Sequence, residues 1–136
     1  MLNSVKLKDH MIENPVTVRS DADLFDAVAL ILDHRISGLC VVDGDGNLVG
    51  VLSELDCLRA TLSASYENRT RVGSVGDYMT KDVISADLDD DIVEVAADML
   101  KNRHRRRPIL KNGKLVGQIS CRQLLAAMRA FSVKPS

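Results

Sequence analysis

Aromatic residues are scarce in this sequence, and neither sign of charge is in excess. Its 136 residues contain two Tyr, two Phe and no Trp, which leaves little side-chain surface on which nucleobases could stack. The 18 Lys and Arg residues are balanced by 19 Asp and Glu, for a formal net charge of -1. We therefore expect no general electrostatic attraction to nucleic acid or to an anionic membrane.

The sequence also lacks long hydrophobic runs. The uncharged stretch near its middle, Ile36–Val42, is far shorter than the ~20 apolar residues that span a bilayer. Residues 1–11 contain no apolar segment of the length that a signal peptide needs. With 46% apolar and 27% charged residues, the composition is that of an ordinary soluble domain. We predict a cytoplasmic protein that does not enter a membrane.

Cysteine and histidine are too few and too scattered to indicate a catalytic or metal site. The cysteines form no Cys-x-x-Cys pair, which argues against a disulfide framework and a zinc site and fits a reducing compartment. The histidines have neither metal-ligand spacing nor a nucleophile partner. We predict that this chain is not an enzyme and that its cysteines fill apolar positions. The cysteines are Cys40, Cys57 and Cys121, and the histidines are His10, His34 and His104.

The chain contains one internal repeat. Asp9-His10-Met11 recurs as Asp77-Tyr78-Met79, an offset of 68 residues from position 9 to position 77. Apolar residues between 24 and 32 recur at the same offset, with the i, i+3, i+4, i+7, i+8 spacing of a helix that buries one stripe. Gly-Asn-Leu-Val-Gly at 46–50 recurs as Gly-Lys-Leu-Val-Gly at 113–117, one residue closer, because the turn before it is shorter. An ordered match of this kind indicates a duplicated unit.

Each copy predicts the same order of elements, β-α-β-β-α. A short strand of β-branched residues comes first, then a helix that opens with aspartates, then a hairpin and a closing helix. The predicted elements are strands at 16–18 and 83–85, helices at 22–34 and 90–102, hairpin strands at 39–42 with 49–52 and at 108–110 with 115–119, and closing helices at 55–64 and 122–131. The hairpin turn at Asp43–Gly46 lacks the remaining ligands of a calcium loop.

These patterns predict an α+β fold of two repeats. We place the first repeat, with its N-terminal lead-in, at residues 1–64, a polar connector at 65–76 and the second repeat at 77–136. One copy alone has too little interior for a stable core. We therefore expect the two sheets to pack face to face with pseudo-twofold symmetry.

Three segments of the first copy resemble the CBS domain, the regulatory module named after cystathionine β-synthase. They are Asp-His-Met-Ile-Glu-Asn-Pro-Val-Thr-Val at 9–18, Gly-Leu-Cys-Val-Val-Asp at 38–43 and Leu-Val-Gly-Val-Leu-Ser-Glu-Leu-Asp at 48–56. The resemblance covers roughly residues 5–131 and, because the pattern occurs twice, implies a tandem pair, called a Bateman module. It implies a free-standing sensor of an adenine nucleotide (AMP, ADP or ATP) with no required cofactor.

The resemblance also implies one ligand site built from both copies. Ser53-x-x-Asp56, after the third strand of the first copy, matches the family's sugar-binding element. Asp56 at a helix start would accept two hydrogen bonds from a ribose diol, and Ser53 would offer its hydroxyl to a phosphate. The family's adenine contacts correspond to Val51, Val83, Ile84 and Pro108, and its phosphate contacts correspond to Arg105 and Arg106.

The second copy departs from this pattern. Its equivalent element is Ser120-x-x-Gln123, in which an amide replaces the carboxylate and cannot make the same charge-assisted, bidentate contact. The strand implied to serve this second site lies around Pro15 and Val16. We predict one good site centred on Asp56 and a second, weak or empty site centred on Gln123.

Other interpretations of the same residues stay open. Ser-x-x-Asp by itself is a helix N-cap signal. The basic run at 103–107 could be a solvated face, and Arg103 and Arg107 fit that interpretation better than Arg105 and Arg106. A pair with an empty pocket would serve as a dimerisation or interaction module. A nucleic-acid binder that uses residues 103–107 is a third alternative, opposed by the net charge and the scarcity of aromatic residues.

The expected partners follow from these alternatives. Members of the family commonly pair through their amphipathic helices into a flat dimer, so we expect a homodimer whether or not the pocket is occupied. A sensor also requires an effector protein that distinguishes its two states. We therefore expect a nucleotide, a second copy of the chain and an unknown effector protein as partners, and no membrane partner.

Overall fold

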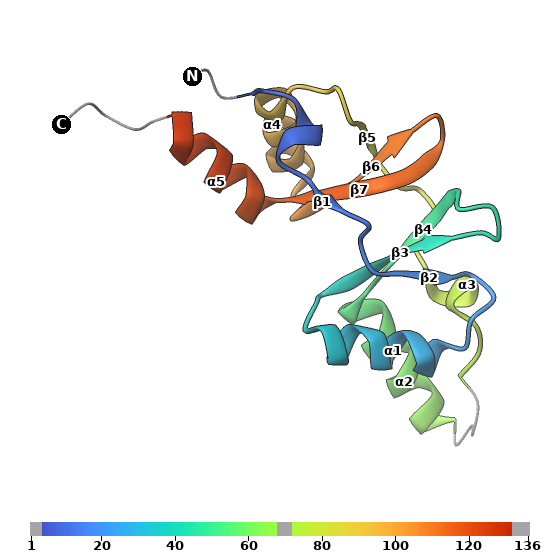
Figure 1. Ribbon diagram of the computed structural model, residues 1–136. Helices are drawn as coiled ribbons and strands as arrows, with labels where there is room; N and C mark the ends of the chain where they lie inside the picture. The colour runs from blue at the N-terminus through green and yellow to red at the C-terminus, as the bar shows by residue number, and fades with distance from the viewer. Residues whose placement is uncertain (1–3, 68–71, 132–136) are drawn as a thin grey trace. The chain divides into compact units, whose positions relative to one another are not determined.

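Both halves of the chain contain the predicted order β-α-β-β-α, each after a short lead-in (Figure 1). The computed structural model describes residues 4–67 and 72–131. The first half contains η1 (Leu7–Asp9), β1 (Ile12–Glu13), β2 (Thr17–Arg19), α1 (Leu24–His34), β3 (Gly38–Val42), β4 (Leu48–Ser53) and α2 (Glu54–Tyr66). The second half contains α3 (Val75–Tyr78), β5 (Ala86–Asp87), α4 (Ile92–Asn102), β6 (Arg106–Lys111), β7 (Lys114–Ser120) and α5 (Cys121–Phe131).

Aspartate caps set the start of the first long helix in each half. The Asp23 carboxylate accepts a hydrogen bond from the backbone in the first turn of α1, and Asp91 does the same for α4. These bonds satisfy N–H groups that have no partner within the helix. Both helices bury the apolar stripe that their spacing predicts, which includes Leu24 and Ala27 in α1 and Ile92 in α4.

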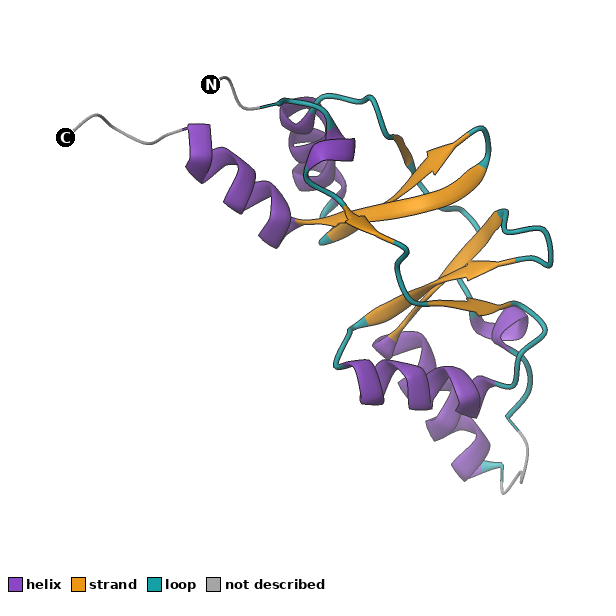
Figure 2. Ribbon diagram, in the orientation of Figure 1, coloured by secondary structure: helices purple, strands orange, loops and turns teal. Residues whose placement is uncertain are grey.

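The strands form two sheets of mixed direction. The three-stranded sheet has the order β2-β3-β4, in which β2 runs parallel to β3 and β3 runs antiparallel to β4. The four-stranded sheet has the order β1-β7-β6-β5, in which β5 runs parallel to β6 and the other pairs are antiparallel. Figure 2 shows α1 and α2 on one face of the first sheet, and α4 and α5 on one face of the second. This is the predicted α+β class.

The predicted strand at 83–85 is wrong. The structure has no strand there and begins β5 at Ala86, which pairs with Ile109 of β6. The Val83 N–H donates to the Lys81 carbonyl at 3.0 Å, the i to i+2 bond of a tight γ-turn. This turn takes the β-branched residues Val83 and Ile84 away from the sheet, so their strand propensity is overridden by the local backbone.

Each compact unit contains a segment from the other half of the sequence. One unit is Val16–Val83, and the other joins the chain before Val16 to the chain from Ile84 onward. The N-terminal lead-in therefore packs with the second repeat, where Leu7 is fully buried, and residues 72–83 pack with the first, where Val75 is fully buried. The compact units thus differ from the predicted division at 1–64 and 77–136. Residues 68–71 of the predicted connector, and the ends 1–3 and 132–136, lie outside the described residues.

The same backbone pairing joins each lead-in segment to the sheet of its unit. The lead-in segments are residues 4–15 in one unit and residues 72–83 in the other. β1 pairs with β7 through Ile12 and Gln118, and the matching bridge in the other unit joins Thr80 to Val51. Gly50 lies beside this bridge, and a Cβ added there would be 2.6 Å from the Met79 sulfur and 2.8 Å from the Thr80 carbonyl oxygen. The equivalent glycine in β7 has the same close contact with the methionine of the N-terminal lead-in. The repeated Met and Gly motifs are therefore the two sides of one packing contact.

Among the described residues, a separate hydrophobic core lies under each sheet. One includes Leu39, Val41 and Leu52, and the other includes Ile109 and Ile119, each with apolar residues from the helices of its own unit. Across residues 4–67 and 72–131, every helix is too short or too polar to cross a membrane. The fold therefore buries apolar side chains within each unit, as an amphipathic pattern predicts.

Substitution of Gly50 by alanine tests the contact between lead-in and sheet. We expect Gly50→Ala to lower the free energy of unfolding by about 1–3 kcal/mol, because the new methyl group has to displace the Thr80 backbone. Gly44→Ala is a matched control, since the atoms nearest to its Cβ lie 3.7 Å away in the flexible Arg19 side chain. It should stay within about 0.5 kcal/mol of wild type. Urea denaturation measures both, and equal values for the two variants would contradict the close packing.

Candidate ligand-binding site

The Ser53-x-x-Asp56 element forms a reciprocal cap at the start of α2. The Asp56 N–H donates to the Ser53 hydroxyl oxygen at 3.1 Å, and the Ser53 N–H donates to Asp56 Oδ2 at 2.9 Å. This arrangement is a capping box, so the N-cap interpretation of the motif is confirmed. It also fixes the Asp56 carboxylate at the junction of β4 and α2, where its side chain keeps 14% of its surface exposed.

The second oxygen of Asp56 is held less firmly. Oδ1 lies 3.6 Å from Nη1 of Arg59, whose side chain is 76% exposed. An ion pair with so exposed a partner contributes little to stability and exchanges readily with solvent. The capping box therefore orients the carboxylate while leaving one oxygen able to accept a hydrogen bond from a ligand hydroxyl.

The other predicted contacts of the first copy lie on the adjacent strand and lead-in. Val51 of β4 exchanges two backbone hydrogen bonds with Thr80, at 3.0 Å and 2.9 Å, so the lead-in is fixed beside the strand that ends at Ser53. Val83 is half-buried and Ile84 is exposed. The structure thus places Val51, Ser53 and Val83 in one unit, whereas Ile84 belongs to the other.

The basic run does not form one continuous solvated face. Arg103 ends α4 in the left-handed conformation, and Arg105 is exposed in the turn that follows. Arg106 begins β6, is half-buried and already has an interaction partner. Arg107 is buried, so the prediction that it lies on a solvated face is wrong. Its burial removes one of the charges that a nucleic-acid interface would need to expose.

Arg107 is held by an ion pair and a histidine. Its Nη1 lies 2.6 Å from Oδ2 of Asp98 in α4, and its Nη2 donates to Nδ1 of His104 at 3.1 Å. Arg107 alternates along β6 with Arg106 and Pro108, so these two residues point to the opposite face of the sheet. Pro108 is buried. The structure therefore brings the predicted phosphate contacts Arg105 and Arg106 close to Pro108 on one strand and the turn before it.

The second copy repeats the cap with an amide in place of the carboxylate. Gln123 Oε1 accepts hydrogen bonds from the Ser120 N–H at 2.7 Å and from the Ser120 hydroxyl at 2.8 Å. Both bonds use the one oxygen of the amide, so Gln123 has less capacity to accept a ligand hydroxyl than a carboxylate has. The implied partners of this site, Pro15 and Val16, are half-buried and lie on either side of the division between the units.

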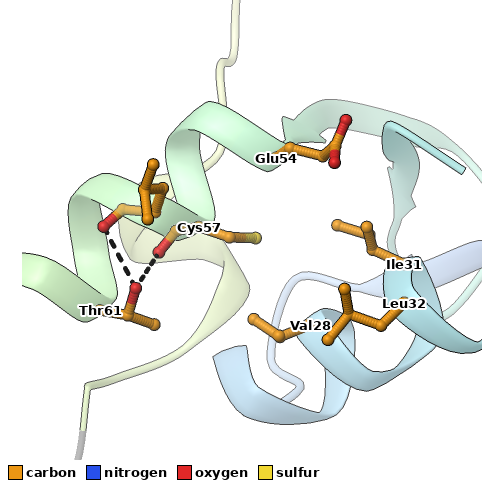
Figure 3. Close-up of a pocket in the computed structure, with 7 residues that line it drawn as sticks. Val28, Ile31, Leu32, Glu54, Cys57 and Thr61 are labelled. Carbon is orange, nitrogen blue, oxygen red and sulfur yellow. Dashed lines mark hydrogen bonds between the residues drawn. The ribbon is translucent and has the colours of Figure 1, made fainter.

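A groove between α1 and α2 is absent from the sequence predictions. It has a volume of about 260 Å³, and Figure 3 shows the apolar side chains of α1 directed toward Cys57 of α2. The signal that could have revealed it is the exposed apolar series Leu55, Leu58 and Leu62 on α2, which the core does not use. The groove is lined by Val28, Ile31, Leu32, Glu54, Cys57, Leu58 and Thr61.

The cysteines have different environments. Cys40 and Cys57 are buried, as predicted, but Cys121 is exposed at the start of α5, so the prediction that it fills an apolar position is wrong. Burial raises the pKa of the Cys57 thiol, and the negative charges of Asp56 and Glu54 raise it further. Within the described part of the chain, no group of three or more His, Cys, Asp or Glu side chains could hold a metal ion.

Comparison with known sequences identifies both halves of the chain as similar to one domain. A family model described as the CBS domain matches residues 7–63 and 75–130. An uncharacterized protein of Methanocaldococcus jannaschii, MJ1225, is 32% identical over 84% of this chain, which spans 39% of that protein. The inosine-5'-monophosphate dehydrogenase of Nitrosopumilus maritimus is 35% identical over 78% of this chain, which spans 20% of the enzyme. The chain thus matches a minor part of both proteins.

Solved structures of similar proteins include complexes with adenosyl compounds. The structure of CBSX2 in complex with AMP is 25% identical, covers 96% of this chain and all of that chain, and superposes with a TM-score of 0.84. A structure of the CBS domain pair of protein MJ0100, in complex with 5'-methylthioadenosine and S-adenosyl-L-methionine, is 26% identical. It covers 93% of this chain and 99% of that chain, with a TM-score of 0.75.

Thiol labelling tests the environment of Cys57. Because its raised pKa keeps it as a thiol, we expect iodoacetamide at about pH 8 to alkylate Cys121 at least about tenfold faster than Cys57. Glu54→Gln removes one of the charges that raise the pKa, so it should speed Cys57 alkylation about twofold and leave Cys121 unchanged. Mass spectrometry of the digested protein measures both rates. Labelling of Cys57 as fast as Cys121 would contradict the burial and the raised pKa of Cys57.

Proposed function

This chain belongs to the CBS domain family, and we propose that it is a regulatory module that binds an adenine nucleotide and transmits the binding to a partner protein. The observation that carries the proposal is the capping box of α2, which fixes the Asp56 carboxylate and leaves one oxygen available to a ligand. A ribose diol presents two adjacent donors to such an acceptor. The role is regulatory binding rather than catalysis.

The adenosine part of the ligand has support from the similar structures. CBSX2 was solved with AMP, and the MJ0100 domain pair with two other adenosyl compounds. The group that these three ligands share is an adenine base joined to a ribose ring. We propose that Asp56 holds the ribose of such a ligand, that apolar contacts hold its base, and that the Ser53 hydroxyl is offered to a phosphate. The proposed base contacts are Val51, Val83, Ile84 and Pro108.

A phosphate group distinguishes a nucleotide from the other adenosyl compounds. We propose that Arg105 and Arg106 hold this group, because a guanidinium donates two parallel hydrogen bonds that match phosphate oxygens. The equivalent residues in the first repeat are Ser37 and Gly38, which carry no charge. AMP, ADP and ATP all fit this chemistry, and they differ in how far the phosphates extend.

The two repeats are proposed to differ in affinity. The Asp56 site has a charged acceptor, whereas the second site would depend on the amide of Gln123, whose oxygen is already used twice. We propose that this second site, with Ser120, Pro15 and Val16, is weak or empty. Ligand binding at the first site then shifts the balance between two arrangements of the protein, and the effector protein binds one of them more tightly.

Ligand-induced stabilisation tests the nucleotide proposal. We expect AMP, ADP or ATP at ~100 times its dissociation constant to add about 2.7 kcal/mol to the stability of the wild type, seen as a rise of several degrees in Tm. Asp56→Ala should abolish this rise, because it removes the proposed ribose acceptor. Gln123→Ala, which removes the matching cap in the second copy, should retain the rise. A rise that survives in Asp56→Ala would contradict the assignment.

Self-association is a second proposed property, favoured by the apolar surface of α2. Leu55, Leu58 and Leu62 are each more than half exposed, and Leu58 also lines the groove beside α1. Exposed apolar side chains that gather on one helix face are typical of a protein interface. We propose that a second copy of the chain covers this surface, and that the pairing would also occur in a module whose pocket is empty.

Replacement of one leucine on this surface tests the pairing. Leu58→Glu places a charge in the proposed interface, so we expect it to weaken dimerisation by at least about tenfold. Asn112→Asp is a control with the same change of charge, at an exposed hairpin turn, and it should leave dimerisation unchanged. Sedimentation equilibrium measures the dissociation constant of each. A monomeric wild type, or an unchanged Leu58→Glu variant, would contradict the proposal.

A further inference from the structure

A polar cluster lies under the sheet of the second repeat, where the first repeat is apolar. Arg107 is 3% exposed, yet it makes an ion pair with Asp98 and a hydrogen bond with His104. At an offset of 68 the first repeat has Leu30, Ile36 and Leu39 in place of these three residues. Leu39 is buried in the core, and the other two pack against it.

The cluster is not explained by the needs of the fold. The first repeat forms the same helix and strand with apolar residues at all three positions, so the architecture does not require charge there. Burial removes the Arg107 guanidinium from water, whereas the side chain of its partner Asp98 stays 47% exposed. Such a pair often gives no more stability than apolar residues of similar volume, because the buried charge loses its hydration. In addition, Nε of Arg107 is buried without a hydrogen-bond partner among the described residues. A cluster with this cost points to a role in function.

The position of the cluster indicates what that role is. His104 and Arg107 stand on either side of Arg105 and Arg106, and their side-chain hydrogen bond spans this pair. Two backbone hydrogen bonds also fix this turn. The His104 N–H donates to the Met99 carbonyl in α4, and the Cys121 N–H at the start of α5 donates to the Arg105 carbonyl. The charged anchor to Asp98 in α4 then restrains the start of β6.

Strand geometry connects this anchor to the opposite face of the sheet. Consecutive residues of a strand point to opposite faces, so when Arg107 is held toward α4, Arg106 has to leave the strand on the other side. Arg106 is also paired in register with Ser120 of β7. The cluster therefore determines where the Arg106 side chain starts and in which direction it leaves the backbone.

We propose that Asp98, His104 and Arg107 form a brace that positions Arg105 and Arg106 to bind the phosphate of the ligand. The three are positioning residues, since they act through the two arginines rather than through contact with the ligand. The inference rests on the proposed nucleotide function and adds to it the reason why the second repeat carries charge in its core. We therefore expect loss of the brace to weaken the binding of AMP, which carries the phosphate, and to leave the binding of adenosine unchanged.

The ratio of two dissociation constants isolates this effect. Calorimetry with AMP and with adenosine, on the full chain, gives the factor by which the phosphate tightens binding. We expect His104→Ala to lower this factor by about tenfold, because Arg107 loses one of its two partners. His104→Asn keeps an acceptor near the position of Nδ1 and should restore most of the factor. General loss of stability would weaken both ligands together and leave their ratio unchanged.

A second variant replaces the whole cluster with the residues of the first repeat. The triple variant combines Asp98→Leu, His104→Ile and Arg107→Leu, which are the apolar residues that the first repeat packs at these positions. We expect circular dichroism to show a folded protein, and calorimetry to show that this protein no longer binds AMP more tightly than adenosine. Ile36→Ala is the matched control, because it truncates the residue equivalent to His104 in the other unit. It should leave the ratio of the two dissociation constants unchanged.

The outcomes separate this inference from the proposed function. If the wild type prefers AMP to adenosine and both the His104→Ala and the triple variant keep that preference, the brace is wrong and the nucleotide proposal stands. If the wild type binds neither compound, the nucleotide proposal is wrong and the brace falls with it. If the triple variant fails to fold, the comparison of His104→Ala with His104→Asn decides the question.

Discussion

The close contact between a methionine and a glycine holds each lead-in segment on its sheet, and the candidate site depends on it. Met79 packs against Gly50 so tightly that a single added methyl group would overlap the Met79 sulfur and the Thr80 backbone. The neighbouring bridge between Thr80 and Val51 fixes the lead-in beside β4, the strand that ends at Ser53. The strand that carries proposed ribose and adenine contacts of this unit is thus held in place by the lead-in, which can approach it closely because Gly50 has no side chain.

The two repeats share this contact between methionine and glycine but differ in the side chains at equivalent positions of the candidate site and the core. Asp56 and Gln123 occupy equivalent caps, yet a carboxylate keeps an acceptor available where an amide has used its oxygen. Leu39 and Arg107 occupy equivalent buried positions, yet one belongs to an apolar core and the other to an ion pair. The two repeats have a common backbone, and these differences support the proposed division of roles, in which Asp56 contacts the ribose and Arg107 positions the arginines that contact the phosphate.

Much of the architecture could be predicted from the sequence because it depends on local rules. The aspartate caps and apolar stripes predict α1 and α4, and the turn residues predict both hairpins. The packing of each lead-in segment with the unit formed by the other repeat could not be predicted in this way, since it depends on contacts between residues far apart in the chain. The strand expected at 83–85 failed because a tight turn at Lys81 overrides the β-propensity of Val83 and Ile84.

The site shows the same limit at the level of single residues. Ser53 and Asp56 were recognisable because cap and ligand motif coincide, whereas the burial of Arg107 depends on Asp98 nine positions earlier, on another element. The basic run at 103–107 allows a solvated Arg107 as one interpretation, because arginine is seldom buried without a partner.

The proposals above require one competent nucleotide site in each chain, and the stoichiometry of AMP binding, measured by isothermal titration calorimetry, tests this requirement. We expect one AMP for each chain, because Asp56 supplies an acceptor that Gln123 cannot match. Two equivalent sites for each chain, or no binding of AMP, ADP or ATP, would contradict it.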